Sequence, residues 1–235
     1  MNVLKTLLTL ILITVSGTNN ISGEKPRNLF FLDSLDVKDT VHGIDISFYQ
    51  KKVQWHKLPN DICFVVIKAT EGSKLKDTKF KENWDSAGKN GYIRGAYHFY
   101  RPYVTPYSQF RNFISVVKLK KGDLPPVVDA EIHSKYTKKL QNDLKIFLNL
   151  LERYYKVKPI IYCNAPFYRK HFYHSYFDQY HFWIADYRGK NLDSTMKMWD
   201  FWQYTCWGNV NGIKGYVDKN YYRWGYDSLR NICLK

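Results

Sequence analysis

The chain has 235 residues, a length that suits one barrel or one large sandwich rather than a two-domain enzyme. Hydrophobic residues make up 45% of it and charged residues 24%, which excludes a disordered or collagen-like chain. The formal net charge is +15, and the four cysteines are too few for a disulfide-dense mini-scaffold and too far apart for a CxxC zinc site. We expect neither a bound metal nor a cofactor.

The N-terminus has the features of a secretory signal peptide. Lys5 precedes an apolar run over residues 7–15, and the small residues Ser16 and Gly17 follow it. The run is shorter than the ~20 apolar residues that a membrane-spanning helix needs, so an uncleaved anchor is the weaker alternative. The sequence predicts a signal peptide over residues 1–20, an N-terminal arm or linker over 21–40, a folded domain over 41–235, and a secreted or periplasmic protein without a membrane span.

The predicted export permits disulfide bonds, because these form outside the reducing cytosol. Cys206 and Cys233 are the expected pair, because both lie in the irregular C-terminal part of the chain. Cys63 and Cys163 lie in apolar, strand-like runs, so we expect them to be buried free thiols.

From residue 41 onward, short apolar runs alternate with amphipathic segments. Helices are predicted over Asp77–Lys89, from Thr105 and Pro106 onward, and over Lys138–Tyr155. Such alternation implies a parallel sheet. Because the chain is short for a regular eight-helix barrel of ~250 residues, we expect an irregular (β/α) barrel of the α/β class, with about eight strands, fewer than eight helices, and little room for helices after Asp186. The expected strands are Gly43–Ser47, Cys63–Thr70, Ile93–Tyr100, Pro126–Glu131, Pro159–Cys163, Phe182–Tyr187 and Phe201–Thr205.

Acidic residues interrupt the apolar runs where strands are expected to end. In parallel α/β folds, the carboxyl ends of the strands carry the chemistry. An unpaired buried carboxylate is costly, so five acids at such positions favour a functional site over solvated strand edges. These acids are Asp45, Asp129, Glu131, Asp186 and Asp218.

The pair Asp129 and Glu131 is the most specific of these signals. Residues two apart in a strand face the same side, so both carboxyl groups are expected on one face. Glycosidic bond cleavage uses two carboxyl groups, one protonated as general acid and one charged to stabilise the cationic transition state. Their mutual repulsion helps to separate the two pKa values.

Aromatic residues are expected to surround these acids, and they suit stacking on sugar rings. About half of them are expected to serve as barrel core instead. His98 is expected to be a structural, hydrogen-bonding histidine rather than a base. The set comprises Tyr97, His98, Phe99, Tyr162, Trp183, Tyr187, Trp202 and Tyr204.

These motifs together resemble glycoside hydrolase family 25, the lysozymes (N-acetylmuramidases) of the Chalaropsis and phage-lysin type. Each motif is weak alone, but they occur in family order and cover residues 41–220. They are GIDIS with Asp45, FVVIKATEG (Phe64–Gly72), GAYHFYRP (Gly95–Pro102), PPVVDAE (Pro125–Glu131), KPIIYCN (Lys158–Asn164), WIADY (Trp183–Tyr187), FWQYT (Phe201–Thr205) and GYVDKN (Gly215–Asn220).

The resemblance implies a catalytic barrel domain over residues 41–235 that cuts the β-1,4 bond from N-acetylmuramic acid to N-acetylglucosamine in peptidoglycan. It implies that Glu131 is the general acid/base, that Asp129 assists the substrate's 2-acetamido group, and that Asp45 and Asp218 are supporting acids. It also implies retention of configuration, with the substrate's amide oxygen as candidate nucleophile, although the spacing of the two carboxyl groups does not itself choose the stereochemistry. The expected substrate-binding residues are Tyr97, Phe99, Tyr162, Trp183, Asp186 and Gln203.

Two alternative functions remain open at this point. A non-catalytic peptidoglycan-binding barrel would be expected to lack one of the acids, and all four catalytic candidates are present. A glycosidase for a related N-acetylhexosamine glycan, such as a chitinase, would carry DxxDxDxE, of which only the final D-x-E is found.

The excess of basic residues bears on the partners. A basic surface would attract anionic wall polymers in addition to the peptidoglycan glycan strands. Candidates are Lys118, Lys120 and Lys121, and the set Lys135, Lys138 and Lys139, although solvated charge is the simpler interpretation of either cluster. We expect no nucleic-acid partner, because the chain is predicted to be exported, and we expect a monomer.

Overall fold

The computed structural model describes residues 41–188, 192 and 198–235. The signal peptide and linker predicted over residues 1–40 lie outside the described residues. Within the described part, no helix is both long enough and apolar enough to cross a bilayer.

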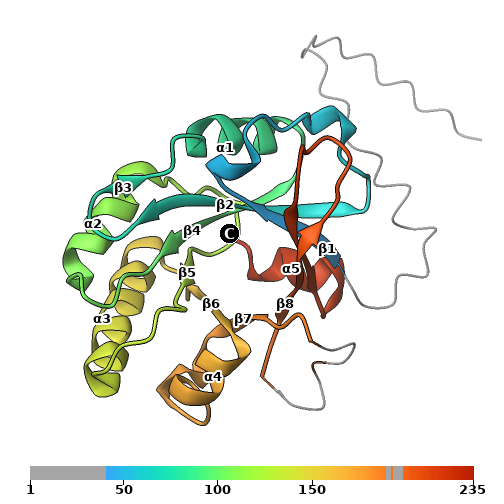
Figure 1. The fold of residues 1–235 in the computed structure, drawn as a ribbon. Helices are drawn as coiled ribbons and strands as arrows, with labels where there is room; N and C mark the ends of the chain where they lie inside the picture. Colours follow the sequence, from blue (N-terminus) through green and yellow to red (C-terminus); the bar gives the residue numbers. More distant parts are fainter. Residues whose placement is uncertain (1–40, 189–191, 193–197) are drawn as a thin grey trace, which may run out of the picture.

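The described residues form a closed barrel of eight strands (Figure 1). Around the barrel the order is β1, β9, β8, β7, β6, β5, β4, β2, and pairing of β1 with β2 closes it, while the two-residue β3 pairs with the end of β2. The strands are β1 (Val41–Ile46), β2 (Ile62–Glu71), β3 (Leu75–Lys76), β4 (Ile93–Phe99), β5 (Val127–Asp129), β6 (Ile160–Asn164), β7 (His181–Ala185), β8 (Phe201–Gly208) and β9 (Val217–Tyr222).

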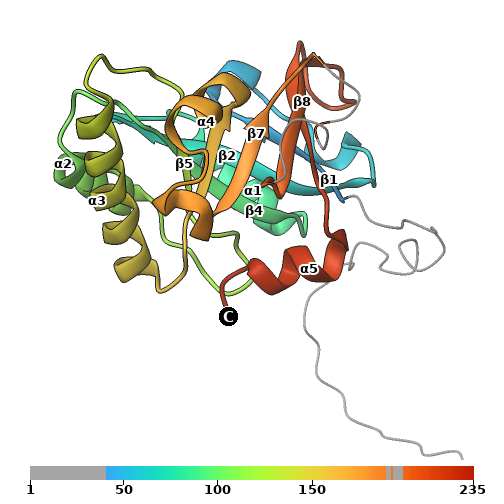
Figure 2. The same ribbon diagram turned by 90° about the horizontal axis from the view of Figure 1, so that it is seen from below.

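Five α-helices are present in the described ranges, so the expected irregular barrel with fewer than eight helices is confirmed. Figures 1 and 2 show α1 to α4 around the outside of the barrel, and α5 at one end of it. Three short 3₁₀ turns cover Phe48–Gln50, Trp55–Lys57 and Tyr176–Gln179. The helices are α1 (Phe80–Lys89), α2 (Pro106–Val116), α3 (Thr137–Tyr155), α4 (Ala165–His171) and α5 (Gly225–Ile232).

The helix signals in the sequence act as predicted in α2 and α3. Thr105 caps α2 by accepting a hydrogen bond from the Ser108 backbone, and Pro106 occupies its first turn. The predicted apolar face of α3 packs against the barrel through Leu140, Leu144, Phe147, Leu148 and Leu151, all buried. Helix α1 begins three residues later than expected, because the Asp77 carboxylate accepts hydrogen bonds from the backbones of Lys79 and Phe48 instead of entering the helix.

The last strand runs against the others, which the alternation of strands and helices did not predict. The sheet is parallel from β1 through β2, β4, β5, β6 and β7 to β8. Strand β9 is antiparallel to both β8 and β1, because a short connection reverses the chain after β8. Helix α5 follows β9, so the expectation of few helices after Asp186 holds except for this one.

The expected disulfide between Cys206 and Cys233 is wrong, because neither of these two cysteines is in a disulfide bond. Cys206 lies near the carboxyl end of β8, whereas Cys233 follows α5 at the other end of the barrel, where its thiol donates to the Leu229 carbonyl at 3.2 Å. The error came from treating this part of the chain as irregular when it is a strand and a helix. Cys163 is buried as expected, and Cys63 is half-buried.

Side chains fill the barrel interior and leave space at one end. Phe64, Phe201 and Ile160 are buried in this interior together with Val127 and Trp183. Gly43 is required beside them, because a Cβ at this position would lie 2.4 Å from the Phe64 ring. Val127 and Trp183 also line the cavity at the carboxyl ends of the parallel strands, so the packed interior forms the floor of that cavity.

Candidate active site

A cavity of about 330 Å³ lies where the parallel strands end. Side chains from β1, β2, β4, β5, β6, β7, β8 and β9, and from the segments that follow β1, β5 and β7, surround it. This position is the one at which α/β barrels carry their catalytic groups. The lining residues are Asp45, Ser47, Tyr49, Gln50, Lys68, Tyr97, Phe99, Val127, Asp129, Glu131, Tyr162, Trp183, Tyr187, Gln203 and Asp218.

Asp45 is the most strongly hydrogen-bonded acid of this cavity. Its Oδ2 accepts from Gln203 Nε2 at 2.9 Å and from Asn220 Nδ2 at 2.8 Å. Burial raises the pKa of Asp45, while these two amide donors and the Asp218 carboxyl group oppose the rise. The donors therefore favour the charged form of Asp45.

The amides that face Asp45 are themselves held in one orientation. Gln203 Oε1 accepts a hydrogen bond from Tyr162 at 2.8 Å and another from Tyr187. Asn220 Oδ1 accepts from the Trp183 indole at 3.0 Å. Because each amide oxygen is occupied by a donor, each NH₂ group must point toward Asp45.

Asp218 faces Asp45 directly across the antiparallel pair of β1 and β9. Burial and the nearby Asp45 charge raise the pKa of Asp218 to about 9. Asp218 thus keeps its proton at neutral pH and donates it to Asp45.

Asp129 and Glu131 stand together on the opposite side of the cavity. Strand β5 ends at Asp129, earlier than expected, yet both carboxyl groups line the cavity as the i, i+2 spacing predicts. Burial, followed by the Glu131 and Asp45 charges, raises the pKa of Asp129 well above its usual range. Burial and the Asp45 charge also raise the pKa of Glu131. Asp129 Oδ1 is buried and accepts no hydrogen bond from the described residues, so a donor on a bound molecule would satisfy it.

Lys68 supplies a positive charge on the cavity wall. Its Nζ lies 2.7 Å from Glu71 and 5.0 Å from the centre of the Phe99 ring. Arg101 binds the same Glu71 carboxylate and lies 4.8 Å from the same ring. Lys68 lowers the pKa of both Asp129 and Glu131, against the larger effect of burial.

The structure brings together nine of the ten site residues predicted from the sequence. Asp45, Asp129, Glu131 and Asp218 line the cavity with Tyr97, Phe99, Tyr162, Trp183 and Gln203. Asp186 is not a lining residue: its carboxylate binds Arg188 at 2.9 and 3.0 Å, and its backbone carbonyl accepts from Trp202.

Three other residues of the predicted aromatic set serve the core or the outer surface. His98 is fully buried and hydrogen-bonds Thr70 at 2.7 Å and Gln109 at 3.0 Å, as expected for a structural histidine. Burial lowers its pKa to about 4, which keeps the ring neutral. Trp202 and Tyr204 pack against Tyr221 outside the cavity.

Six residues of the site escaped the sequence reasoning. Ser47, Tyr49, Gln50, Lys68 and Val127 line the cavity, and Asn220 supports Asp45. Four of them lie inside motifs already recognised: Ser47 in GIDIS, Lys68 in FVVIKATEG, Val127 in PPVVDAE, and Asn220 two residues beyond Asp218 in GYVDKN. The two-residue period of β9 places Asn220 on the face of Asp218, a signal that could have identified it.

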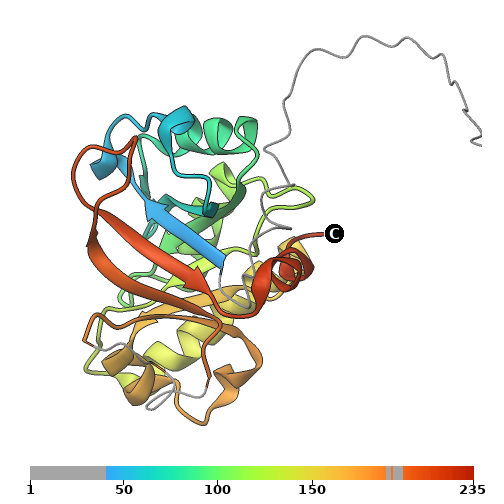
Figure 3. The ribbon, with the colours of Figure 1, turned by 90° about the vertical axis from the view of Figure 1, so that its right-hand side faces the viewer.

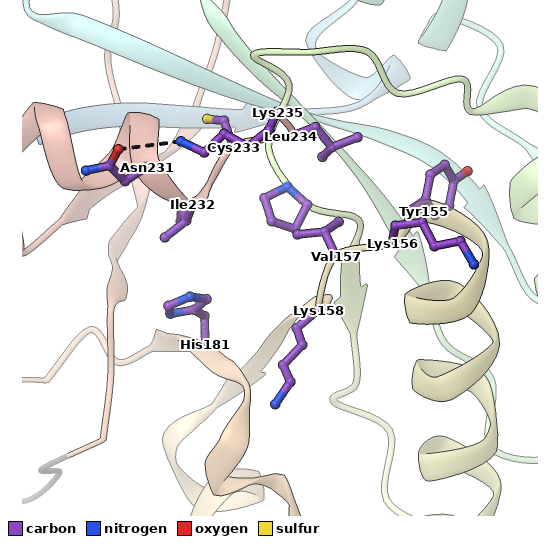
Figure 4. A pocket seen from close by; sticks show the side chains of 11 residues that line it. Tyr155, Lys156, Val157, Lys158, His181, Asn231, Ile232, Cys233, Leu234 and Lys235 are labelled. Atoms are coloured by element: carbon purple, nitrogen blue, oxygen red, sulfur yellow. Dashed lines mark hydrogen bonds between the residues drawn. The ribbon is translucent and has the colours of Figure 1, made fainter.

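A second cavity, of about 530 Å³, lies at the other end of the barrel (Figure 4). It lies between the connection from α3 to β6 and the segment that ends α5, and its lining includes Lys156, Lys158 and Lys235. None of its lining residues carries a carboxylate side chain, and His181 at its edge binds Asp200. Although this cavity is larger, the paired acids lie in the other one.

No group of three or more His, Cys, Asp or Glu side chains within the described ranges is arranged to hold a metal ion.

Comparison with known proteins places this arrangement in a family. The model of glycosyl hydrolases family 25 matches residues 44–213. The uncharacterized protein YegX of Escherichia coli O6:H1 is 33% identical over 253 residues, covering 94% of this chain and 93% of YegX. Lysozyme M1 of Streptomyces globisporus is 29% identical over 77% of this chain and 67% of its own length.

Solved structures agree with the sequence comparison. A family 25 glycosyl hydrolase from Bacillus anthracis superposes with a TM-score of 0.77 and 29% identity, covering 84% of this chain and 95% of that one. A bacterial lysozyme from Streptomyces coelicolor gives a TM-score of 0.76 and 28% identity, covering 85% and 99%. The chain therefore belongs to family 25 of the glycosyl hydrolases and is a glycoside hydrolase.

Proposed function

We propose that this protein is a muramidase that hydrolyses the β-1,4 bond between N-acetylmuramic acid and N-acetylglucosamine in peptidoglycan. Similar proteins named as lysozymes or muramidases support this substrate class. The observation that carries the proposal is the pair Asp129 and Glu131, with a buried carboxyl oxygen of Asp129 that no described residue satisfies. An acetamido N–H, present on both sugars, would satisfy that oxygen.

In the proposed reaction, Glu131 is the general acid and base. Its raised pKa keeps a proton available for the glycosidic oxygen as the bond to the anomeric carbon breaks. Asp129 accepts the acetamido N–H, and the acetamido oxygen attacks the anomeric carbon to form a cyclic intermediate. Glu131, now deprotonated, takes a proton from water, which opens that intermediate with net retention of configuration.

Asp45 and Asp218 have a supporting role in this proposal. They share one proton across β1 and β9, which leaves one negative charge in the cavity. That charge favours the positively charged transition state, and it also raises the pKa of Glu131. The remaining substrate contacts are proposed for the half-buried side chains of Tyr97, Phe99 and Tyr162.

The test is release of reducing ends from purified peptidoglycan, with mass spectrometry of the products. We expect the wild type to release fragments with N-acetylmuramic acid at the reducing end. Glu131→Gln should lower kcat by at least ~100-fold, the scale of losing a general acid, without unfolding the protein. Asp129→Asn should also lower kcat, because the amide cannot stabilise the charge that develops on the acetamido group.

Asp186→Asn is a control, because Asp186 is acidic and near the cavity but does not line it. Its activity should stay within about threefold of wild type, since the ion pair of Asp186 with Arg188 lies outside the cavity lining. Equal activity of wild type and Glu131→Gln would contradict the assignment of the acid. Cleavage of chitin oligomers alone would favour a related hexosaminidase, and wall binding without cleavage would favour a binding protein.

We also propose that the protein is exported and that residues 1–20 are removed as a signal peptide. Peptidoglycan lies outside the cytoplasmic membrane, so a muramidase must reach it. N-terminal sequencing of the secreted protein should begin near residue 21, and retention of Met1 in that fraction would contradict removal.

A further inference from the structure

Two aromatic side chains project into solvent beside the cavity, where the proposed function gives them no role. Trp207, near the end of β8, is 68% exposed, and Tyr216, just before β9, is 57% exposed. Their ring centres are 5.1 Å apart and their planes meet at 84°. Large aromatic surface left in water on a soluble protein commonly marks a binding site.

This pair is attached to the cavity wall. Gln50, a lining residue, donates a hydrogen bond from Nε2 to the Tyr216 carbonyl at 3.1 Å. The backbone of Gln54 donates to the Gly212 carbonyl at 2.8 Å, so the same segment also holds the turn between the two strands. Figures 1 and 3 show this turn beside the segment that follows β1.

The pair also continues the surface of the cavity. Tyr216 directly precedes β9, and Asp218, the second residue of that strand, lines the cavity. Tyr49 lines the cavity and is 72% exposed, next to Gln50. A strip of three aromatic rings, Tyr49, Tyr216 and Trp207, thus borders one side of the cavity; we call it the aromatic rim.

The size of the cavity shows why such a rim is needed. At about 330 Å³, it is near the lower limit of small-molecule pockets, which span about 300–1,000 Å³. A glycan strand is a polymer, so most of its sugars must lie outside the cavity. Apolar sugar faces stack on aromatic rings, whereas the amide and hydroxyl groups remain in water.

We propose that the aromatic rim is an accessory binding site for the glycan strand, which holds N-acetylhexosamine units beyond those in the cavity. The proposal rests on the proposed function for the identity of the sugar. It predicts that the enzyme prefers long strands to short fragments, and that Trp207 and Tyr216 cause this preference.

The experiment compares kcat/KM for tetrasaccharide and octasaccharide fragments of alternating N-acetylglucosamine and N-acetylmuramic acid. For Trp207→Ala and for Tyr216→Ala, the octasaccharide value should fall about tenfold, a change of about 1.4 kcal/mol. The tetrasaccharide value should stay within twofold. Trp207→Phe should restore most of the loss, because it returns an aromatic face.

Tyr173→Ala is the matched control, since Tyr173 is 60% exposed but lies after α4, away from the aromatic rim. It should change neither value. Equal losses on both fragments in the Trp207 and Tyr216 variants, or no loss on either, would overturn the accessory site. A concentration-dependent dimer in sedimentation, lost in Trp207→Ala, would overturn it in favour of a contact between two copies of the chain.

A binding measurement separates failure of this inference from failure of the proposed function. Calorimetry with Glu131→Gln gives the Kd of each fragment without cleavage. If the wild type cleaves neither fragment, the muramidase proposal fails, but octasaccharide binding about tenfold weaker in Glu131→Gln/Trp207→Ala would still support the accessory site. Unchanged octasaccharide binding in that double variant would overturn it.

Discussion

Four acids share one cavity, and their neighbours decide which of them carries charge. Asp45 receives two hydrogen bonds from side-chain amides, whereas Asp218 receives one only from its own backbone amide, and the proton stays on Asp218. Repulsion among closely spaced carboxyl groups requires such an uneven distribution. At the residue scale, the amides of Gln203 and Asn220 therefore matter as much as the acids themselves.

This arrangement predicts how stability depends on pH. Because the pKa of Asp218 rises from 3.8 to about 9 on folding, the folded protein keeps a proton that the unfolded chain releases between these values. Stability is therefore highest below pH 4 for this group and falls as the pH rises toward 9. Asp218→Asn removes this loss and still offers an N–H donor to Asp45. Its free energy of unfolding should exceed that of wild type at about pH 9 by several kcal/mol, and the difference should be much smaller at about pH 5.

Urea denaturation at the two pH values measures this difference. Asp227→Asn is a control, because Asp227 is an exposed acid on α5, away from the cavity. If Asp218→Asn raises the free energy of unfolding equally at both pH values, the titration of Asp218 is not the cause of the increase.

At the element scale, one glutamine joins α2 to the end of β4. Gln109 is fully buried: its Oε1 accepts from His98 and from the Arg101 backbone, and its Nε2 donates to the Arg101 and Val104 carbonyls. With a neutral His98 that donates from Nε2, Thr70 donates to the other ring nitrogen. This network holds the segment that follows Phe99, the last residue of β4 and a lining residue of the cavity.

Removing this glutamine should cost more than removing the helix cap. Gln109→Ala leaves several buried groups without partners, so we expect a loss of about 3 kcal/mol in the free energy of unfolding. Thr105→Ala removes one exposed cap bond and should cost about 1 kcal/mol. Urea denaturation of both variants measures the two losses in the free energy of unfolding. Equal losses would show that the buried network contributes no more to stability than the cap.

At the scale of the whole molecule, the fold separates the two basic clusters predicted from the sequence. Lys135, Lys138 and Lys139 lie where β5 leads into α3, at the end of the barrel that carries the active-site cavity. Lys118, Lys120 and Lys121 lie where α2 leads into β5, at the opposite end. All six side chains are exposed, and Lys139 binds Asp143.

This separation predicts that substitutions in the two lysine clusters weaken binding to the cell wall unequally. Changing Lys135, Lys138 and Lys139 to Gln should weaken binding to anionic cell walls several-fold at low salt. This cluster lies at the end of the barrel where the cavity would bind the glycan strand. Added salt should reduce the difference, since the Debye length is about 10 Å at 0.1 M. The same change at Lys118, Lys120 and Lys121 is the matched control and should have less effect in a sedimentation assay with purified walls. Equal effects of the two triple variants would contradict the prediction.

The sequence by itself determined the class of fold, the family and the acids of the site. Alternating apolar runs and an amphipathic α3 suffice for a barrel, because burial of apolar surface follows periodicity along the chain. Asp129 and Glu131 could be placed on one face because they are two residues apart. Local signals of this kind do not require knowledge of distant segments.

Only the tertiary structure decided the rest, because those features depend on residues far apart in the chain. Asp45 meets Gln203 and Asn220 across separations of 158 and 175 residues, and no local pattern predicts those contacts. The antiparallel β9 closes the barrel, brings Asp218 opposite Asp45, and sends α5 and Cys233 away from Cys206. Asp186, which the sequence placed at the cavity, lies outside its lining: Trp202 of β8 donates to its backbone carbonyl, and its carboxylate binds Arg188 nearby in the chain.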